Sequence, residues 1–489
     1  MSVAFGYDGD GLLTSAGDES LVHAGSSGLL TSAAVGEVDV AWTYDALGSV
    51  ATAVTRYDGD EVASFAYELD ELGRIVTVTE TVDGDARVTA YAYDEAGRLS
   101  SVDVDAANVA SYEYDGNGNR IEITTVVGGT PTVASASIDA QDRLVVQGDV
   151  EFEYAVTGEL LSRSEDVLGL VAVTQYEHDA FGQLVAVELP DATLVEYELD
   201  ARGRRVSRSV DGVLQQQWLY RSQLQVVAEL DGAGDEVSRF VYGSHGHVPD
   251  LVLRDGSTYR LVVDHVGSVR LVVDVATGAI AQRLDYAGPG GPWGEVLLDT
   301  NPGFQPFGFA GGLYDAATGL VHFGAREYDP SIGRWISKDP VGFDGGTNHF
   351  AYCEGDPVNL VDPNGENPIG AAAAACAASA WCASLVATGA SLLYAQAVCF
   401  ASGACKLPPF PRFDFDLRLP ESCRPIADKL RDRVSRVSPY REPAERPERE
   451  CWVNSDIPSW EAWDSERQKI IEYCSYKCND GHAYAGLCP

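Results

Sequence analysis

The chain has 489 residues, of which 74 are acidic and 34 basic, so its formal net charge is −40. A phosphate backbone recruits lysine and arginine, and this charge therefore argues against nucleic acid as the partner of the acidic part of the chain. That part is residues 1–365, with 58 acidic and 20 basic side chains, whereas residues 366–489 carry 16 and 14. Nine of the ten cysteines lie between Cys376 and Cys488. Charge and cysteine content both change near residue 365, which predicts a domain boundary there.

The first residues, Met1 to Tyr7, lack the basic and apolar stretches of a signal peptide. The sequence also begins within a repeat. We therefore expect export to be encoded elsewhere, or the chain to be the end piece of a longer protein.

A motif recurs along the first 210 residues: an aromatic residue, any residue, Tyr, Asp, two residues and Gly. Its clearest copies span residues 42–48, 91–99 and 112–120, and weaker copies lie at 67–75, 138–144, 154–160, 178–184 and 199–206. Successive copies are roughly 20–25 residues apart, a period that is typical of repeat architectures.

Each copy predicts a β-hairpin. The aromatic-x-Tyr part alternates as a strand does, and Asp-x-x-Gly is typical of a turn in which Asp bonds locally and Gly supplies a positive φ. One hairpin cannot bury its own apolar face, so neighbouring copies must stack. A sandwich or a propeller, with a blade period nearer to about 40 residues, is the alternative. Residues 115–119 resemble the start of a calcium loop, but the Gly and Glu expected at positions six and twelve are absent, so we expect a repeat turn.

The most specific stretch is residues 313–365. It contains Leu313-Tyr-Asp-Ala-Ala-Thr-Gly-Leu320, Arg326-Glu-Tyr-Asp-Pro-Ser-Ile-Gly-Arg-Trp335 and two Asp-Pro-x-Gly motifs that begin at Asp339 and Asp362. With the repeats, it resembles the Rhs-repeat-associated core that ends the YD-repeat shell of bacterial Rhs proteins and of the C component of insecticidal toxin complexes; animal teneurins share the shell. The resemblance implies a mainly β fold, with a YD-repeat β-shell over residues 1–312 and a plug at 313–365. Shells of this family are longer, so we expect an incomplete β-cocoon.

The resemblance also implies chemistry. In characterised relatives the core is a self-cleaving aspartyl-type peptidase, and its two acids and assisting arginine correspond to Asp339, Asp362 and Arg326. Two neighbouring carboxylates do not both ionise easily, so one can donate a proton while the other accepts one. The expected cut follows Gly365. Glu366 stands where the family has an apolar residue, which predicts slow, shifted or lost cleavage, and the alternative is that both motifs only form turns that close the plug.

Residues 366–405 form the first part of the tail, and within it residues 369–405 carry no charge and are rich in Ala. This composition leaves three alternatives, namely a packed helical hairpin, a membrane-inserting segment or a flexible one. Residues 406–489 are predicted to be a variable, Cys-rich domain. Apolar residues at helical spacing predict helices near 426–437 and 459–478, so we expect a small, mainly helical tail.

The cysteines of the tail allow three states. Cys474, Cys478, His482 and Cys488 are weak candidates for a zinc site. Nine cysteines in a short segment favour disulfides, which form in oxidising compartments, and free thiols are the third alternative. We expect no cofactor. The tail holds a single histidine, and it shows no residue set of a nuclease, deaminase or protease.

These observations support one hypothesis and two alternatives. The hypothesis is a secreted or cell-surface polymorphic toxin whose shell encloses its own C-terminal tail as cargo and releases it. The tail would then contact membranes through residues 369–405, and an immunity protein would protect the producing cell. The alternatives are a non-enzymatic adhesion or structural YD-repeat protein, and a silent, truncated end-module.

Overall fold

The computed structural model describes residues 3–286, 291–370, 451–453, 460–464, 469–478 and 483–487. The chain divides into two compact units, residues 1–401 and 402–489, and each is described by itself. Within the described residues, helical structure is limited to four short 3-10 turns, η1 (Gly291–Trp293), η2 (Phe309–Gly311), η3 (Gly342–Gly345) and η4 (Cys353–Gly355). None of the helices in these ranges is long and apolar enough to cross a membrane.

The first unit is dominated by one antiparallel sheet of 28 strands, in which each strand pairs with the next along the chain. We call this sheet the strip. Its first half consists of β1 (Phe5–Tyr7), β2 (Leu13–Ala16), β3 (Glu19–His23), β4 (Leu30–Val35), β5 (Val38–Tyr44), β6 (Val50–Tyr57), β7 (Asp60–Leu69), β8 (Ile75–Val82), β9 (Asp85–Tyr93), β10 (Leu99–Val104), β11 (Ala107–Tyr114), β12 (Arg120–Val127), β13 (Thr130–Ile138) and β14 (Leu144–Gln147). Its second half consists of β15 (Val150–Tyr154), β16 (Leu160–Val167), β17 (Leu170–His178), β18 (Leu184–Glu188), β19 (Leu194–Leu199), β20 (Arg205–Val210), β21 (Val213–Tyr220), β22 (Val226–Asp231), β23 (Glu236–Val241), β24 (Leu251–Arg254), β25 (Ser257–Val263), β26 (Val269–Asp274), β27 (Ile280–Asp285) and β28 (Leu298–Asp299). The expected mainly β fold is confirmed.

The repeat turn folds through local contacts, as the turn between β9 and β10 illustrates. Asp94 Oδ1 accepts the backbone N–H groups of Ala96 and Arg98, both at 2.9 Å, and Asp94 Oδ2 accepts Arg98 Nε at 2.7 Å. Gly97 has a φ of +88°, a conformation that disfavours a side chain. The predicted Asp-x-x-Gly hairpin turn is therefore confirmed. Asp115 caps the turn at 115–119 in the same way, through the N–H groups of Asn117 and Asn119.

Neighbouring repeats bury one another, as expected. The hydroxyl of Tyr114 donates to the carbonyl oxygen of Leu99 in the preceding repeat at 2.7 Å. The guanidinium of Arg98 lies 4.5 Å above the ring of Tyr114 and also donates to the carbonyl oxygen of Asp115 at 2.9 Å. The same stacking joins Arg74 to Tyr93 and Arg204 to Tyr220. Because one continuous sheet results, separate propeller blades are excluded.

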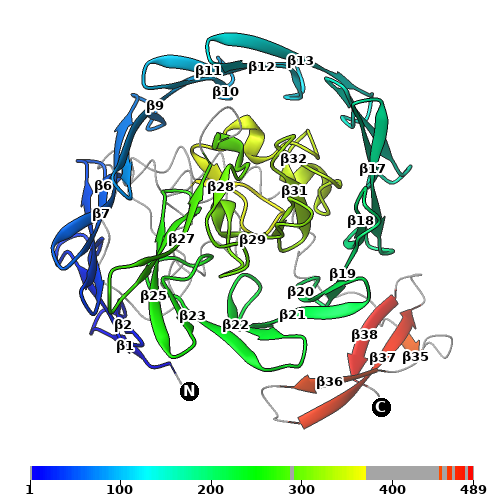
Figure 1. Ribbon diagram of the computed structural model, residues 1–489. Coiled ribbons are helices and arrows are strands. Elements are labelled where there is room, and N and C mark those ends of the chain that lie inside the picture. Colours follow the sequence, from blue (N-terminus) through cyan, green and yellow to red (C-terminus); the bar gives the residue numbers. More distant parts are fainter. Residues whose placement is uncertain are drawn as a thin grey trace, which may run out of the picture. The chain divides into compact units, whose positions relative to one another are not determined.

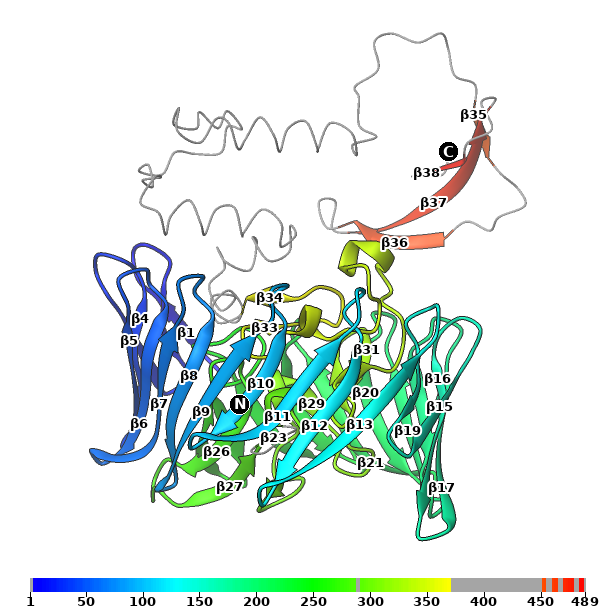
Figure 2. The ribbon, with the colours of Figure 1, turned by 90° about the horizontal axis from the view of Figure 1, so that it is seen from above.

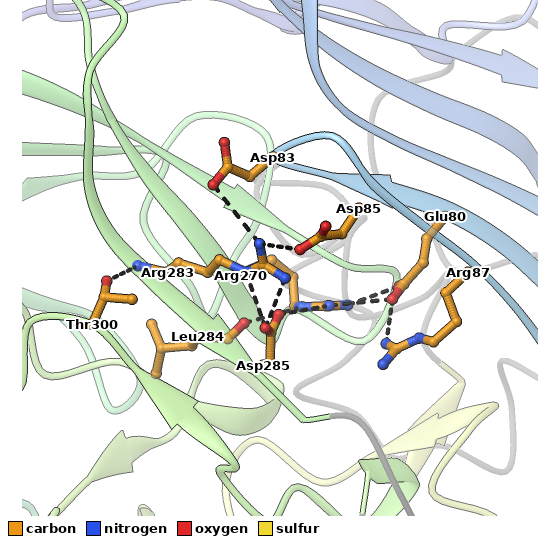
Figure 3. A network of polar contacts seen from close by, with 9 residues as sticks. All are labelled: Glu80, Asp83, Asp85, Arg87, Arg270, Arg283, Leu284, Asp285 and Thr300. Atoms are coloured by element: carbon orange, nitrogen blue, oxygen red, sulfur yellow. Dashed lines mark hydrogen bonds and ion pairs between the residues drawn. The ribbon is translucent and has the colours of Figure 1, made fainter. Parts of the chain in front are cut away.

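The strip curls into a ring, and its end returns to its beginning (Figure 1). We call the contact between β23–β27 and β2–β9 the seam. Both sides contribute to one apolar cluster, which includes Leu21, Val38, Phe65, Leu251, Leu271 and Val273. Charged pairs cross the seam as well. The side chains of Arg270 and Glu80 form one such pair at 2.9 Å (Figure 3). The side chains of Arg283 and Asp85 form a second such pair at 2.7 Å.

The strip surrounds the plug, residues 313–365, in Figure 1, and Figure 2 shows the C-terminal part of the plug at one rim of the strip. Its strands are β29 (Leu313–Tyr314), β30 (Val321–Phe323), β31 (Arg326–Asp329), β32 (Arg334–Trp335) and β33 (Leu360–Val361), and the last pairs with β34 (Ile369–Gly370) just beyond it. An aromatic core of Phe323, Tyr328, Trp335 and Tyr352 fills the plug. Polar contacts join the plug to repeats that are distant in the sequence. For example, Arg334 Nη1 donates a hydrogen bond to Asn119 Oδ1 at 3.0 Å.

The described part of the second unit is a small antiparallel sheet of β35 (Cys451–Val453), β36 (Trp460–Asp464), β37 (Lys469–Cys478) and β38 (Ala483–Leu487). The predicted helix at 459–478 is therefore wrong for residues 460–464 and 469–478, and the expectation of a mainly helical tail fails for the described ranges. The segment is rich in Trp, Ile and Tyr, which favour strands, and short apolar runs do not separate the two structures by periodicity. The predicted helix at 426–437 and the segment 371–405 lie outside the described residues.

Candidate cleavage site in the plug

The three candidate catalytic residues that were predicted from the sequence lie close together in the plug. Arg326 is the first residue of β31, Asp339 follows β32, and Asp362 directly follows β33. Nη2 of Arg326 lies 2.8 Å from Asp339 Oδ2 and 3.1 Å from Asp362 Oδ2. All three side chains are almost fully buried, with exposed fractions of 3%, 3% and 1%. The carboxylates thus share one guanidinium although 23 residues separate them in the sequence.

The same cluster holds the backbone that follows Asp362. Arg326 Nε donates to the carbonyl oxygen of Gly365 at 2.5 Å. Asp362 Oδ1 accepts the N–H groups of Glu366 at 3.0 Å and of Asn367 at 3.1 Å. The peptide bond between Gly365 and Glu366 is therefore contacted at its oxygen by a cation and at its nitrogen by a carboxyl group.

A tight hairpin brings these groups together. In the β30–β31 ladder Phe323 pairs with Arg326, and Ala325 in the connecting turn donates its N–H to the carbonyl oxygen of Asn364 at 3.0 Å. Gly365 has a φ of +67°, and a Cβ at this position would overlap the carbonyl oxygen of Phe323. The close approach of the two backbones therefore requires glycine here.

The two Asp-Pro-x-Gly motifs also form turns. Asp339 Oδ1 accepts the N–H of Val341 at 3.0 Å, and the N–H of Gly342 donates to the carbonyl oxygen of Asp339 at 3.0 Å. A role in the turn therefore accounts for the contact of Asp339 Oδ1. It does not explain why Asp339 Oδ2 and Asp362 converge on Arg326.

Burial sets the protonation of the acids. Removal from water raises the pKa of Asp362 to about 6, because it outweighs the nearby charge of Arg326 and the two backbone hydrogen bonds. Burial also raises the pKa of Asp339 above its ordinary value, against the effect of Arg326. Near pH 6 one carboxyl group can therefore hold a proton while the other is ionised, which is what general acid–base catalysis needs.

Two neighbours were not predicted from the sequence. The carbonyl oxygen of His349 accepts Arg326 Nη1 at 3.2 Å, and its ring packs edge-on to Phe343 at 4.7 Å between centroids. Cys353 is buried beside the site, and burial, followed by the charge of Asp362, raises the pKa of its thiol. Neither residue belongs to a motif that sequence inspection could single out.

The candidate zinc ligands lie in the second unit. Cys474 and Cys478 belong to β37, whereas His482 and Cys488 are outside the described residues. In the described ranges no group of three or more His, Cys, Asp or Glu side chains could hold a metal. The register of β35 and β37 places Cys451 opposite Cys478.

Comparisons with known proteins place this geometry in a family. A family model described as Teneurin YD-shell matches residues 52–351. Teneurin-4 of Homo sapiens is 30% identical over 309 residues, which are 62% of this chain and 10% of teneurin-4. The tRNA3(Ser)-specific nuclease WapA of Bacillus spizizenii is 27% identical over 359 residues, which are 63% of this chain and 15% of that protein. The chain thus spans only a small part of these relatives.

Among solved structures, the crystal structure of TcdB2-TccC3-Cdc42 is similar with a TM-score of 0.53 and 19% identity, over 77% of this chain and 21% of that chain. The crystal structure of TcdB2-TccC3 gives a TM-score of 0.53 at 18% identity, over 74% and 21%. At this identity the similarity concerns the fold, an open shell of the same kind. The family match covers more than half of the sequence, and the chain belongs to the teneurin YD-shell family.

Proposed function

We propose that this chain is the shell and release module of a Rhs-type toxin, and that it cleaves itself between Gly365 and Glu366. The observation that carries the proposal is that Arg326, which pairs with both Asp339 and Asp362, contacts the oxygen of this peptide bond, while Asp362 accepts its N–H. The released segment, residues 366–489, is the cargo. The relationship to a bacterial nuclease and the shell fold shared with TccC3 support a toxin, and a secreted or cell-surface location follows from such a role.

The chemistry is hydrolysis. Ionised Asp339 takes a proton from a water molecule, whose oxygen attacks the carbonyl carbon of Gly365. Arg326 stabilises the negative charge that develops on the Gly365 oxygen. Protonated Asp362, which contacts the nitrogen of Glu366, gives its proton to that nitrogen as the C–N bond breaks. The products are a carboxylate on Gly365 and a new amino terminus on Glu366.

The test is the integrity of the full chain after purification, followed by gel electrophoresis and intact mass. We expect the wild type to yield residues 1–365 and a second piece of 124 residues. Asp339→Asn and Asp362→Asn should both stay whole. Asp94→Asn is the matched control, because it alters the equivalent turn carboxylate of a strip repeat and should be cut normally. A second piece that begins at Asn367 would move the cut to the neighbouring bond, and an uncut wild type would favour turns without catalysis.

The effect of the tail requires a separate experiment. We expect residues 366–489 to harm bacteria when expressed in the cytoplasm or the periplasm, and the uncharged segment 369–405 to mediate membrane contact. The released tail should then leak dye from lipid vesicles, and Val386→Asp with Leu392→Asp should abolish the leakage, since a charge at mid-bilayer costs roughly 2.5–3.5 kcal/mol. Co-expression with an immunity protein should restore growth.

The second candidate function is adhesion through the shell. The 30% identity with teneurin-4 supports it. An uncut chain that harms no cell from either compartment but binds cell surfaces would favour adhesion. A chain without any of these properties would be a silent end-module.

A further inference from the structure

A buried arginine of the strip contacts the plug next to the cleavage site. Arg205 opens β20 and is 1% exposed. Its Nη2 lies 2.9 Å from Oε1 of Glu327, and the same oxygen contacts Nδ1 of His322 at 2.6 Å. The guanidinium also lies 3.6 Å from the ring centroid of Tyr197 in β19. Strip and plug are therefore joined by a charged cluster that excludes solvent.

This cluster lies on the hairpin that holds the bond to be cut. His322 pairs with Glu327 in the β30–β31 ladder, directly beside the pair of Phe323 and Arg326. Adjacent strand residues point to opposite faces, so Glu327 faces Arg205 of the strip while Arg326 faces the two aspartates. Because the two pairs are adjacent in a short hairpin, a shift of the His322–Glu327 pair also moves the Phe323–Arg326 pair. It therefore changes the contact of Arg326 with Gly365.

The buried carboxylate of Glu327 depends on the positive charge of Arg205. Burial alone would raise the pKa of Glu327, but the charges of Arg205 and then of His322 hold it below its ordinary value. Without Arg205, a buried carboxylate would lack its main counter-charge. It would have to take up a proton or move toward solvent, and either change would shift the hairpin.

We propose that Arg205 is a positioning residue for self-cleavage, and that the cut therefore waits until the plug is seated on β19 and β20. This inference rests on the proposed function. It couples release to assembly, because a chain whose strip has not formed around the plug cannot align Arg326 with Gly365. Arg205 does not touch the reacting atoms and acts only through Glu327.

The strip offers a matched control. Arg208, also in β20, contacts Asp315 of the plug, with Nε 2.6 Å from Asp315 Oδ2. Asp315 follows β29 and donates its N–H to the carbonyl oxygen of Leu320, just before β30 and at the opposite end of that strand from the pair of Phe323 and Arg326; its Oδ2 also accepts the hydroxyl of Tyr197 at 2.7 Å. Arg208→Met therefore removes a second ion pair between the same strand and the plug, but leaves the Glu327 contact in place.

The experiment is to isolate the full chain in urea from inclusion bodies, before it has folded and cut itself, to refold it by dilution and to follow the appearance of residues 366–489 on gels. We expect Arg205→Met to slow cleavage about hundredfold, since misplacing a reacting group by about 1 Å has effects of this size. Arg205→Lys, which keeps the charge, should recover most of the rate. Arg208→Met should cleave within about threefold of the wild type at a comparable loss of melting temperature.

A further variant guards against misfolding. Arg205→Met combined with Glu327→Gln leaves no uncompensated charge, so the chain should refold, yet cleavage should remain at least about tenfold slow. Wild-type rates in Arg205→Met or in Arg205→Met combined with Glu327→Gln, or equal slowing by Arg208→Met, would overturn the inference. A wild type that does not cleave would instead overturn the proposed function, so the two failures are distinguishable.

Discussion

The strip and the plug are built from the same residue types but by different kinds of contact. In the strip, Asp94 meets Arg98 four residues away, and the same pair recurs from repeat to repeat. In the plug, Arg326 meets Asp362 across 36 residues, and Arg334 meets Asn119 across 215. A local contact can be lost from one repeat while the others keep theirs. The long-range contacts of Arg326 and Arg334 do not recur in this way, so we expect the plug to tolerate fewer changes.

The largest expected difference concerns two arginines. Arg270→Met removes the partner of buried Glu80 across the seam; because Glu80 keeps Arg87, we expect a cost at the lower end of the about 3–5 kcal/mol of a broken buried pair. Arg98→Met removes a partly exposed pair in the strip together with the contacts of Arg98 with Tyr114 and Asp115, which should cost about 1–2 kcal/mol. Urea unfolding of the full chain, followed by circular dichroism, measures both costs. Equal costs would mean that the seam contributes no more to stability than a single repeat turn.

The next effect is a pH dependence confined to the plug. The folded pKa of Asp362, about 6, lies above its ordinary value of 3.8, so the proton that catalysis needs is present below pH 6 and is lost above it. The refolded wild type should therefore cleave about tenfold more slowly for each pH unit above 6. Because the folded pKa of Asp362 lies above its unfolded value, its protonation also contributes to the stability of the fold. This contribution is fully present below pH 3.8 and is lost as the pH rises through 6. A cleavage rate that is flat from pH 6 to pH 8 would contradict the assignment of Asp362 as the acid.

The smallest expected effect compares two glycines with positive φ. At Gly97 the space where a Cβ would stand is open apart from Arg74 at 3.9 Å. Gly97→Ala should therefore cost only the free energy of placing a residue with a Cβ in the left-handed backbone conformation, about 1–2 kcal/mol. Gly365→Ala carries the same cost and also an overlap with the carbonyl oxygen of Phe323. We expect only the second variant to lose cleavage. Thermal unfolding and the refolding assay separate the two effects, and normal cleavage by Gly365→Ala would argue against the close contact of Gly365 with the hairpin.

The same contrast explains what sequence inspection achieved. The hairpins of the strip were predicted because Asp94 and Gly97 fix their turn through neighbours in the sequence. The acids of the plug were named from family resemblance, and the local pattern alone would have suggested turns. Arg205 could not be found, because its partner Glu327 is more than 100 residues away and no feature of the sequence links the two residues.

The error in the tail has a similar origin. Ile470, Ile471 and Cys474 fit a helical face, but the residues around them also suit a strand, and only pairing with other strands separates the two structures. β37 pairs with β35, β36 and β38, which come from different parts of the segment. Pairing between such segments is not encoded in the spacing of apolar residues.

The seam also limits how the sequence can change its length. The pairs of Arg260 with Glu19, Arg270 with Glu80 and Arg283 with Asp85 span 241, 190 and 198 residues. Removing one repeat between these partners would shift all three pairs and the apolar cluster beside them at the same time. Insertions and deletions should therefore be tolerated in whole-repeat steps outside the segment between the two sides of the seam, whereas the number of repeats within that segment is fixed by the side-chain contacts through which its two ends meet.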